Sequence, residues 1–165
     1  MDRVYVSGSL DNQLQLKQLR NYLWVSIDAH EHYKRLHPHI TIIPGFNVRE
    51  ENTNEVRKII RQTRFKGEDI RMKRLAVYEN IHKPYVVQIN IEYDIDEKIK
   101  NLISRLKPLS KTRMREPVSP HITLFKTQGW WDELPRNKKE ILQEEVMSTV
   151  GLRDTEISSV NIEVR

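Results

Sequence analysis

The feature of this sequence that most constrains its fold is a repeated tetrapeptide. Pro-His-Ile-Thr occupies residues 38–41 and again residues 120–123. Each copy runs into a short stretch of apolar residues, HITII in one case and HITLF in the other, which predicts a strand. Two identical motifs in similar surroundings indicate an internal duplication, so the fold must be able to hold the same strand twice.

The elements predicted around the two motifs follow one order in both halves of the chain. Hydrophobic spacing predicts strand, helix, motif strand, helix and strand at residues 3–9, 10–25, 39–43, 50–65 and 68–80. The second half repeats this order at residues 84–93, 94–107, 121–125, 132–150 and 155–164. Two such repeats usually pack with approximate two-fold symmetry around a central cleft. We therefore expect a single domain over residues 1–165, built from repeats at about 1–80 and 81–165.

Turn-forming and capping residues predict where strands and helices end, and the spacing of apolar residues predicts which helix faces are apolar. Pro44 and Gly45 are expected to close the first motif strand, and Asp94 or Asp96 to cap the helix that Pro108 stops. Mostly helical spacing relates Leu14, Leu16, Leu19 and Leu23, and one helical face holds Val56, Ile59, Ile60 and Thr63. In the helix at 94–107, the residues expected to face inward are Ile99, Leu102, Ile103 and Leu106.

Composition narrows the kinds of site and the location that we expect. The chain has no cysteine, which excludes disulfides, thiolate metal ligands and a cysteine nucleophile. No stretch approaches the roughly 20 apolar residues of a membrane helix, and the start lacks a signal-peptide pattern. We expect a soluble, cytoplasmic protein without membrane contact, and a monomer. The formal charge of +5 favours polyanionic partners.

The two motifs place the same pair of functional groups on one face of a strand. Side chains at i and i+2 share a face, so His39 projects with Thr41, and His121 with Thr123. An imidazole takes or gives a proton near neutral pH, and a hydroxyl hydrogen-bonds an oxyanion. On opposite sides of one phosphate, two such pairs supply a general base, a general acid and two donors to oxygen. These groups are sufficient for phosphodiester chemistry without a metal.

Other kinds of site fit the sequence less well. A zinc site needs three or four ligands, whereas each motif offers one His with Thr beside it. His30, His32 and His37 precede His39, but they fall on a predicted helix end or loop, where we expect a surface role. The His-x-His-x-His pattern of histidine-triad nucleotide hydrolases begins at His37 and is broken at Thr41. The sequence also lacks a Gly-x-Ser-x-Gly turn and a Gly-rich phosphate loop. We therefore expect neither a metal nor a cofactor.

With one Pro-His-Ile-Thr motif in each half, the sequence resembles the 2H phosphoesterase superfamily, which includes RNA 2′,3′-cyclic phosphodiesterases, the so-called 2′-5′ RNA ligases. The resemblance covers the whole chain in element order, and it is specific in the two His-x-Thr motifs. It implies a bilobal α+β fold with pseudo-two-fold symmetry, in which two antiparallel sheets with flanking helices surround a central groove. It also implies metal-free cleavage of a cyclic or 2′-linked phosphodiester, with His39 and His121 catalytic and Thr41 and Thr123 binding phosphate.

In the mechanism that we expect, one neutral imidazole deprotonates the attacking water, or a terminal hydroxyl in the ligation direction. The other imidazole, protonated, gives its proton to the leaving ribose oxygen. The two threonines hold the non-bridging oxygens as charge builds. These opposite protonation demands predict a bell-shaped pH profile, while the symmetry of the motifs leaves open which histidine is the base.

A nucleotide substrate also needs groups that contact its base, its sugar and its remaining charge. Aromatic faces stack on any base, and basic side chains in a loop pair with phosphate. Proximity to the repeated elements makes the expected substrate-binding residues Tyr85, Arg113, Arg115, Phe125, Lys126 and Trp130.

Three functions are compatible with these features. The leading one is an enzyme that opens a 2′,3′-cyclic phosphate at an RNA end or cuts a 2′-5′ bond. The second keeps this chemistry but acts on a small signalling oligonucleotide, such as 2′-5′ oligoadenylate or a cyclic dinucleotide. The third is a catalytically silent nucleotide- or RNA-binding module, against which the presence of two proton-transfer groups argues.

Overall fold

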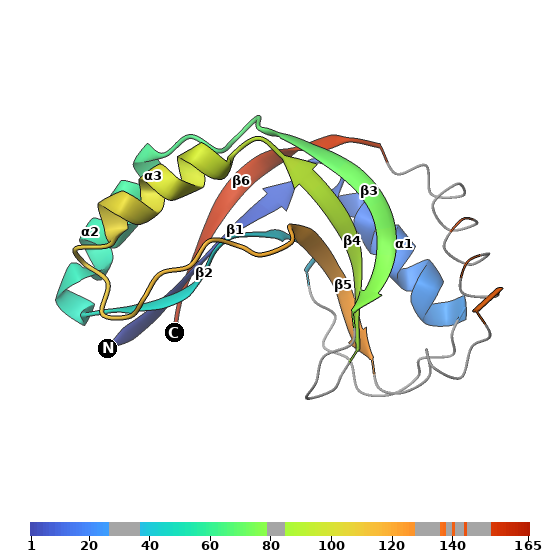
Figure 1. The fold of residues 1–165 in the computed structure, drawn as a ribbon, viewed down its shortest axis with the longest axis horizontal. Coiled ribbons are helices and arrows are strands. Elements are labelled where there is room, and N and C mark those ends of the chain that lie inside the picture. The colour runs from blue at the N-terminus through green and yellow to red at the C-terminus, as the bar shows by residue number, and fades with distance from the viewer. Residues whose placement is uncertain (27–36, 79–84, 128–135, 138–139, 141–143, 145–152) are drawn as a thin grey trace.

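The computed structural model describes residues 1–26, 37–78, 85–127, 136–137, 140, 144 and 153–165, and Figure 1 shows the chain as a ribbon. These residues form an α+β fold of six strands, three α-helices and one short 3₁₀ helix. In chain order the elements are β1 (Asp2–Leu10), α1 (Gln13–Ser26), β2 (Ile40–Val48), η1 (Glu50–Asn52), α2 (Thr53–Gln62), β3 (Asp69–Tyr78), β4 (Tyr85–Tyr93), α3 (Asp96–Leu106), β5 (His121–Thr127) and β6 (Thr155–Val164). Among the described helices, none combines the length and apolarity needed to span a membrane.

The strands close into one antiparallel barrel in the order β1-β2-β5-β4-β3-β6. The sequence led us to expect two separate sheets, one for each half of the chain. The single sheet arises because the last strand of each half pairs with the first strand of the other: β6 runs along β1, and β3 runs along β4. The structure describes only a few residues of the predicted helix at 132–150, and it does not describe the boundary between the halves at residues 80 and 81. The duplication therefore stays a prediction.

Two short pairings divide the barrel into two groups of three strands. Within the described residues, β2 pairs with β5 only at Ile40 and Ile122, and β3 pairs with β6 only near Ile70 and Thr155. We call β6, β1 and β2 the first limb, and β5, β4 and β3 the second limb. In Figure 1 the limbs form an arch, with α2 and α3 side by side along the outside of the first limb and α1 along the outside of the second.

The hydrophobic core lies between the helices and the outer face of the arch. On the helices, the fully buried residues are Leu16, Leu19, Leu23, Val56, Ile60, Ile99, Leu102 and Leu106. Each such side chain contributes roughly 1.5–3 kcal/mol through burial. Ile59 and Ile103 are only partly buried against this core. Leu14, which the helical spacing grouped with Leu16, Leu19 and Leu23, is 69% exposed, because it lies off the buried stripe that the other three form.

The first motif strand does not end at Pro44 and Gly45, as the sequence suggested, but continues to Val48. The pairing with β1 shifts here: Val4 lies opposite Phe46, while Val6 lies opposite Ile43. The two turn-forming residues therefore occupy a β-bulge, where a proline without an N–H breaks no regular ladder bond.

The start of α3 also differs from the expectation. Its N-cap position is Ile95, without a side-chain hydrogen bond, so neither Asp94 nor Asp96 caps the helix. The carboxylate of Asp94 instead accepts two hydrogen bonds from the Arg71 guanidinium, at 2.9 and 3.1 Å. This ion pair lowers the pKa of Asp94. The helix ends at Leu106, before Pro108, as predicted.

Candidate active site

The fold brings the two His-x-Thr motifs side by side at the junction of the limbs. Ile40 of β2 lies opposite Ile122 of β5, and both side chains are fully buried on the helix side of the sheet. In an antiparallel pair this register sets His39 beside Thr123, and Thr41 beside His121. All four polar side chains are half-buried, and strand alternation directs them to the inner face of the arch.

Both imidazoles are held in the same way. His39 Nδ1 lies 2.7 Å from the carbonyl oxygen of His37, and His121 Nδ1 lies 2.9 Å from that of Ser119. A carbonyl oxygen only accepts hydrogen bonds, so Nδ1 carries the proton in each ring. A neutral ring then presents an unprotonated Nε2, which is the atom that can take a proton. Each motif histidine is thus fixed in one tautomer by the residue two positions before it.

A backbone constraint accompanies the second of these contacts. Among the described non-glycine residues, Ser119 alone has a positive φ, of 50°. Residues that precede a proline avoid helical conformations, and here Pro120 follows. Holding this conformation costs roughly 1–3 kcal/mol. The strained residue is the one whose carbonyl orients His121.

Polar side chains that the sequence analysis did not select flank the motifs on both limbs. On β4, Gln88 lies opposite Thr123 and Asn90 lies opposite His121. Gln88 is 3% exposed, and its Nε2 donates to Asn90 Oδ1 at 2.9 Å. On β1, Ser7 lies opposite Thr41. A signal existed in VVQINIEY, where amide side chains alternate with apolar ones, but only the register places those amides beside the motif.

An apolar pocket of about 240 Å³ adjoins the motifs. Besides Thr41 and His121, its lining consists of Ile40, Pro44, Ile91, Tyr93, Pro117, Val118 and Pro120. Val118 is 84% exposed, which is unusual for a valine, whereas Tyr93 is 7% exposed. Burial raises the pKa of the Tyr93 phenol to about 12, so this group stays protonated near neutral pH.

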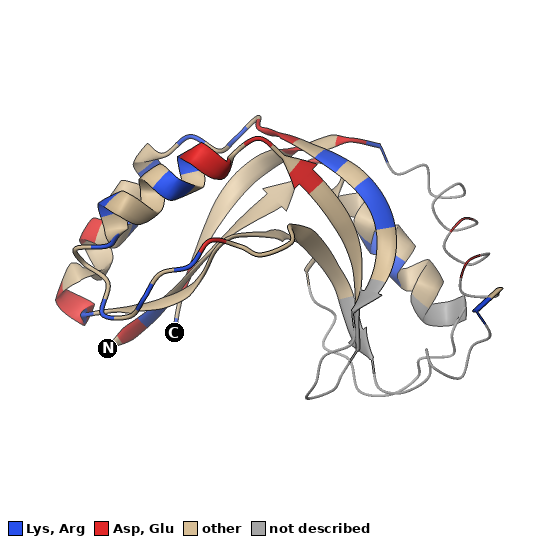
Figure 2. Cartoon of the chain, in the orientation of Figure 1, with Lys and Arg blue, Asp and Glu red and all other residues tan. Residues whose placement is uncertain are grey.

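The other predicted substrate-binding residues have different outcomes. Arg113 and Arg115 line a second pocket, which also shares Pro44 with the apolar one. Figure 2 shows Lys and Arg along the segment between α3 and β5 that carries them. The side chains of Tyr85, Phe125 and Lys126, and all of Trp130, lie outside the described residues, so their roles stay predictions.

The histidines expected at the surface are described only in part. His30 and His32 lie outside the described residues, whereas His37 is exposed. Desolvation lowers the pKa of His37, and the positive charge of Lys17 adds to this shift. The contact of His37 with the motif is made by its backbone carbonyl, which accepts the hydrogen bond from His39 Nδ1.

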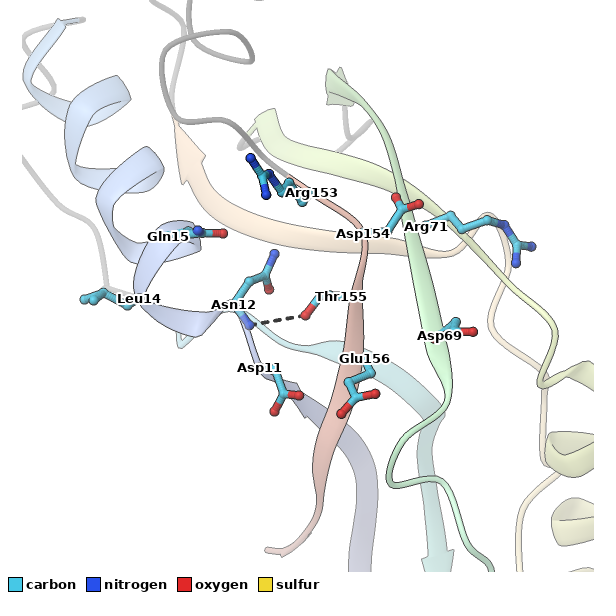
Figure 3. A pocket seen from close by; sticks show the side chains of 10 residues that line it. All are labelled: Asp11, Asn12, Leu14, Gln15, Asp69, Arg71, Arg153, Asp154, Thr155 and Glu156. Atoms are coloured by element: carbon cyan, nitrogen blue, oxygen red, sulfur yellow. Dashed lines mark hydrogen bonds between the residues drawn. The ribbon is translucent and has the colours of Figure 1, made fainter.

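Another pocket lies away from the motifs, where β1 leads into α1 beside the start of β6 (Figure 3). It measures about 840 Å³, and no motif residue lines it. The Asn12 N–H donates to Thr155 Oγ1 at 3.2 Å, and a hydrogen bond with Asp11 raises the pKa of Glu156. The buried side-chain amide of Asn12 has no hydrogen-bond partner among the described residues. Across the described residues, no three His, Asp or Glu side chains are grouped so as to hold a metal.

Comparison with known proteins yields matches in structure only. No family model matches the sequence, and no curated protein matches it. The solved structure of Usb1 from Kluyveromyces marxianus matches with a TM-score of 0.58 and 15% identity, covering 98% of this chain and 93% of that one. The structure of the same protein with uridine monophosphate matches with a TM-score of 0.55 and 15% identity, covering 99% and 94%. At 15% identity, these matches show that the chain shares the fold of the Usb1 structures.

Proposed function

We propose that this protein is a metal-independent phosphodiesterase that acts on 2′,3′-cyclic phosphates or 2′-5′ bonds at the ends of RNA or of nucleotides. The observation that carries this proposal is the register of Ile40 with Ile122, which sets two His-x-Thr motifs side by side on one face. The matched fold of Usb1, which has been solved with uridine monophosphate, supports a nucleotide as the ligand.

The register suits catalysis by an acid and a base on one phosphate. His39 and His121 occupy diagonal positions across the strand pair, as do the two threonines. Diagonal neighbours in an antiparallel pair are about 7–8 Å apart, and we infer that this spacing leaves room for a phosphate between the rings. One imidazole then faces the attacking oxygen while the other faces the leaving oxygen.

Each proton has a defined path in this arrangement. The neutral ring takes a proton at Nε2 from water as the water oxygen forms its bond to phosphorus. The protonated ring gives its Nε2 proton to the ribose oxygen as the bond from that oxygen to phosphorus breaks. The Nδ1 contacts to His37 and Ser119 hold the rings in both protonation states, because Nδ1 is a donor in each. Thr41 and Thr123 donate to the non-bridging oxygens as they gain charge.

The apolar pocket gives the nucleoside a place beside the reacting phosphate. Thr41 and His121 form part of its lining, and its remaining surface comes from proline, valine, isoleucine and tyrosine side chains. Such a surface suits the face of a base more than a second charged group. We therefore assign the pocket to the nucleobase next to the scissile bond.

The test is an assay for products in the presence of a chelator. The protein is incubated with EDTA and 2′,3′-cyclic nucleotides, 2′-5′ and 3′-5′ dinucleotides, and cyclic dinucleotides, and the products are identified by mass. We expect turnover of a 2′,3′-cyclic phosphate or a 2′-5′ bond without added metal. A requirement for a divalent ion, or the absence of turnover on every substrate, would refute the proposal. Turnover of cyclic dinucleotides alone would support the proposed reaction but show that the proposed substrate class is wrong.

A further inference from the structure

A basic pocket lies next to the candidate active site. It measures about 430 Å³ and is lined by Arg3, Pro44, Gly45, Asn47, Thr112, Arg113 and Arg115. Three of these residues are arginines, and none is acidic. Pro44 also lines the apolar pocket at the motifs, so the two pockets adjoin.

The segment that carries two of the arginines is fixed to β2. The Lys111 N–H donates to the carbonyl of Asn47 at 2.7 Å, and the Asn47 N–H donates to Thr112 Oγ1 at 2.9 Å. A β-bridge between Val48 and Ser110 adds a third connection. The backbone that leads into Arg113 is therefore anchored to the same strand that carries the first motif.

The third arginine reaches the pocket because residue 45 has no side chain. A Cβ at Gly45 would lie 2.5 Å from a ring atom of Tyr5 and 2.9 Å from Nε of Arg3. Without it, the Arg3 guanidinium lies over the Tyr5 ring, 5.4 Å from the ring centre. Glycine in the bulge thus lets this stacked pair approach β2.

The charge of the pocket is not neutralised from within the described part of the chain. There, Arg3, Arg113 and Arg115 have no carboxylate at ion-pair distance. Arg165, which stacks on the same Tyr5 ring, differs because it pairs with Glu163 at 2.6 Å. Three unpaired guanidinium groups repel one another, and their fixed forks of donors match the oxygens of a phosphate.

We propose that this pocket binds a second phosphate of the substrate, so that the preferred substrate is a single-stranded oligonucleotide and not a mononucleotide. This inference rests on the proposed function, which places the reacting phosphate at the motifs. Arg3 lies over Gly45, four residues beyond Thr41 on β2, or about 13 Å along the strand. A mononucleotide 2′,3′-cyclic phosphate has one phosphate, and it cannot occupy both positions.

The test compares two substrates that differ in length. Uridine 2′,3′-cyclic phosphate has one phosphate, while a uridine trinucleotide ending in a 2′,3′-cyclic phosphate also has two backbone phosphates. The variants are Arg3→Gln and the double variant Arg113→Gln/Arg115→Gln. Arg61→Gln, on the exposed surface of α2, is the control, because it also removes one positive charge but lies outside the pocket. We expect the pocket variants to lower kcat/KM for the trinucleotide about tenfold or more, mainly through KM, with the mononucleotide within about twofold.

A binding measurement separates failure of this inference from failure of the proposed function. Fluorescence anisotropy with a labelled oligouridylate is carried out on the same variants over a range of salt concentrations. We expect the pocket variants to bind more weakly and to show a shallower salt dependence, by about 0.7 in the logarithmic slope for each lost phosphate contact. If the wild type turns over no substrate but the variants lose affinity, the second phosphate site stands without the proposed reaction. Unchanged affinity, or an equal loss of kcat/KM on both substrates, would overturn the inference.

Discussion

The two motifs share one geometry but are supported by different parts of the structure. Before the first motif, the carbonyl of Pro38 accepts a hydrogen bond from the side-chain amide of Gln13 on α1, at 2.8 Å. Before the second, the carbonyl of Pro120 accepts one from the backbone N–H of Ile91 on β4, at 3.1 Å. The strained Ser119 occurs only beside the second motif among the described residues.

This difference separates the features that the two motifs share from the contacts that support each one. The features that both share, a histidine with Nδ1 on a carbonyl and a threonine two residues later, are those that the proposed reaction uses. The second motif depends on sheet backbone and a strained residue, while the first depends on a helix side chain. The predictions below test this division.

The largest effect is expected from the histidines themselves. His39→Ala and His121→Ala should each lower turnover by about 10²–10⁴-fold, because each removes a proton-transfer group. Activity is measured in chelator, and circular dichroism checks the fold. The two variants should differ on bis(4-nitrophenyl) phosphate, whose leaving group needs no proton. The variant that lacks the general acid should regain activity there, and equal recovery of both would contradict distinct roles.

The next effect tests the strained residue. Ser119→Val should destabilise the protein by roughly 1–3 kcal/mol, because a β-branched side chain is poorly tolerated at positive φ, and should lower turnover as His121 loses its orientation. Ser119→Gly should retain stability, since glycine adopts this conformation freely. The matched change His37→Val should cost little, because His37 is exposed and lacks a positive φ. The measurements are thermal unfolding and kcat. Equal losses of stability and turnover in Ser119→Val and His37→Val would contradict the proposed difference between the two motifs.

A smaller effect is expected at the side-chain support of the first motif. Gln13→Ala removes the hydrogen bond to Pro38 and should destabilise the protein by about 0.5–1.5 kcal/mol. It should also reduce turnover a few-fold through looser placement of His39. Gln15→Ala, an exposed position on the same helix, is the control. If both variants match the wild type in kcat, the amide does not position the motif.

The smallest effect concerns the pocket beside the motifs. The raised pKa of Tyr93, about 12, means that the folded state keeps the phenolic proton longer than the unfolded state, in which it titrates near 10. The stabilisation is fully present below about pH 10 and is lost as pH rises toward about 12. Tyr93→Phe should lack this alkaline loss and retain turnover at pH 7. Denaturant midpoints between pH 8 and 11 provide the measurement, and parallel curves for both proteins would contradict it.

The alternation of the motif strands was sufficient to predict how each motif is arranged. The apolar residue between His and Thr, Ile40 in one motif and Ile122 in the other, is buried. The His and Thr side chains of each motif therefore lie on the other face of the strand. The helices were predicted for a similar reason, because their apolar stripes match the period of a helix. Predictions from such local periodicity agree with the structure wherever one face of a helix or strand packs against the core.

What the sequence could not provide is the relation between distant segments. The pairing of β6 with β1 replaced the two expected sheets with one barrel, and no local pattern encodes strand order. Pro44 and Gly45 look like a turn, but a neighbouring strand absorbs them as a bulge. The sequence analysis did not select Arg3 for the same reason. Arg3 lines one pocket with Arg113 and Arg115 only because of the register of β1 with β2.

The pairing of β2 with β5 at Ile40 and Ile122 has a mechanical consequence. The two imidazoles belong to separate limbs, and the contact that sets the gap between them is among the shortest in the barrel. We expect mild urea to part the limbs before either limb unfolds, so that the proposed activity is lost while helical and strand content persists. In a sheet built in this way, a small movement of one limb against the other acts first on the gap between the two imidazoles.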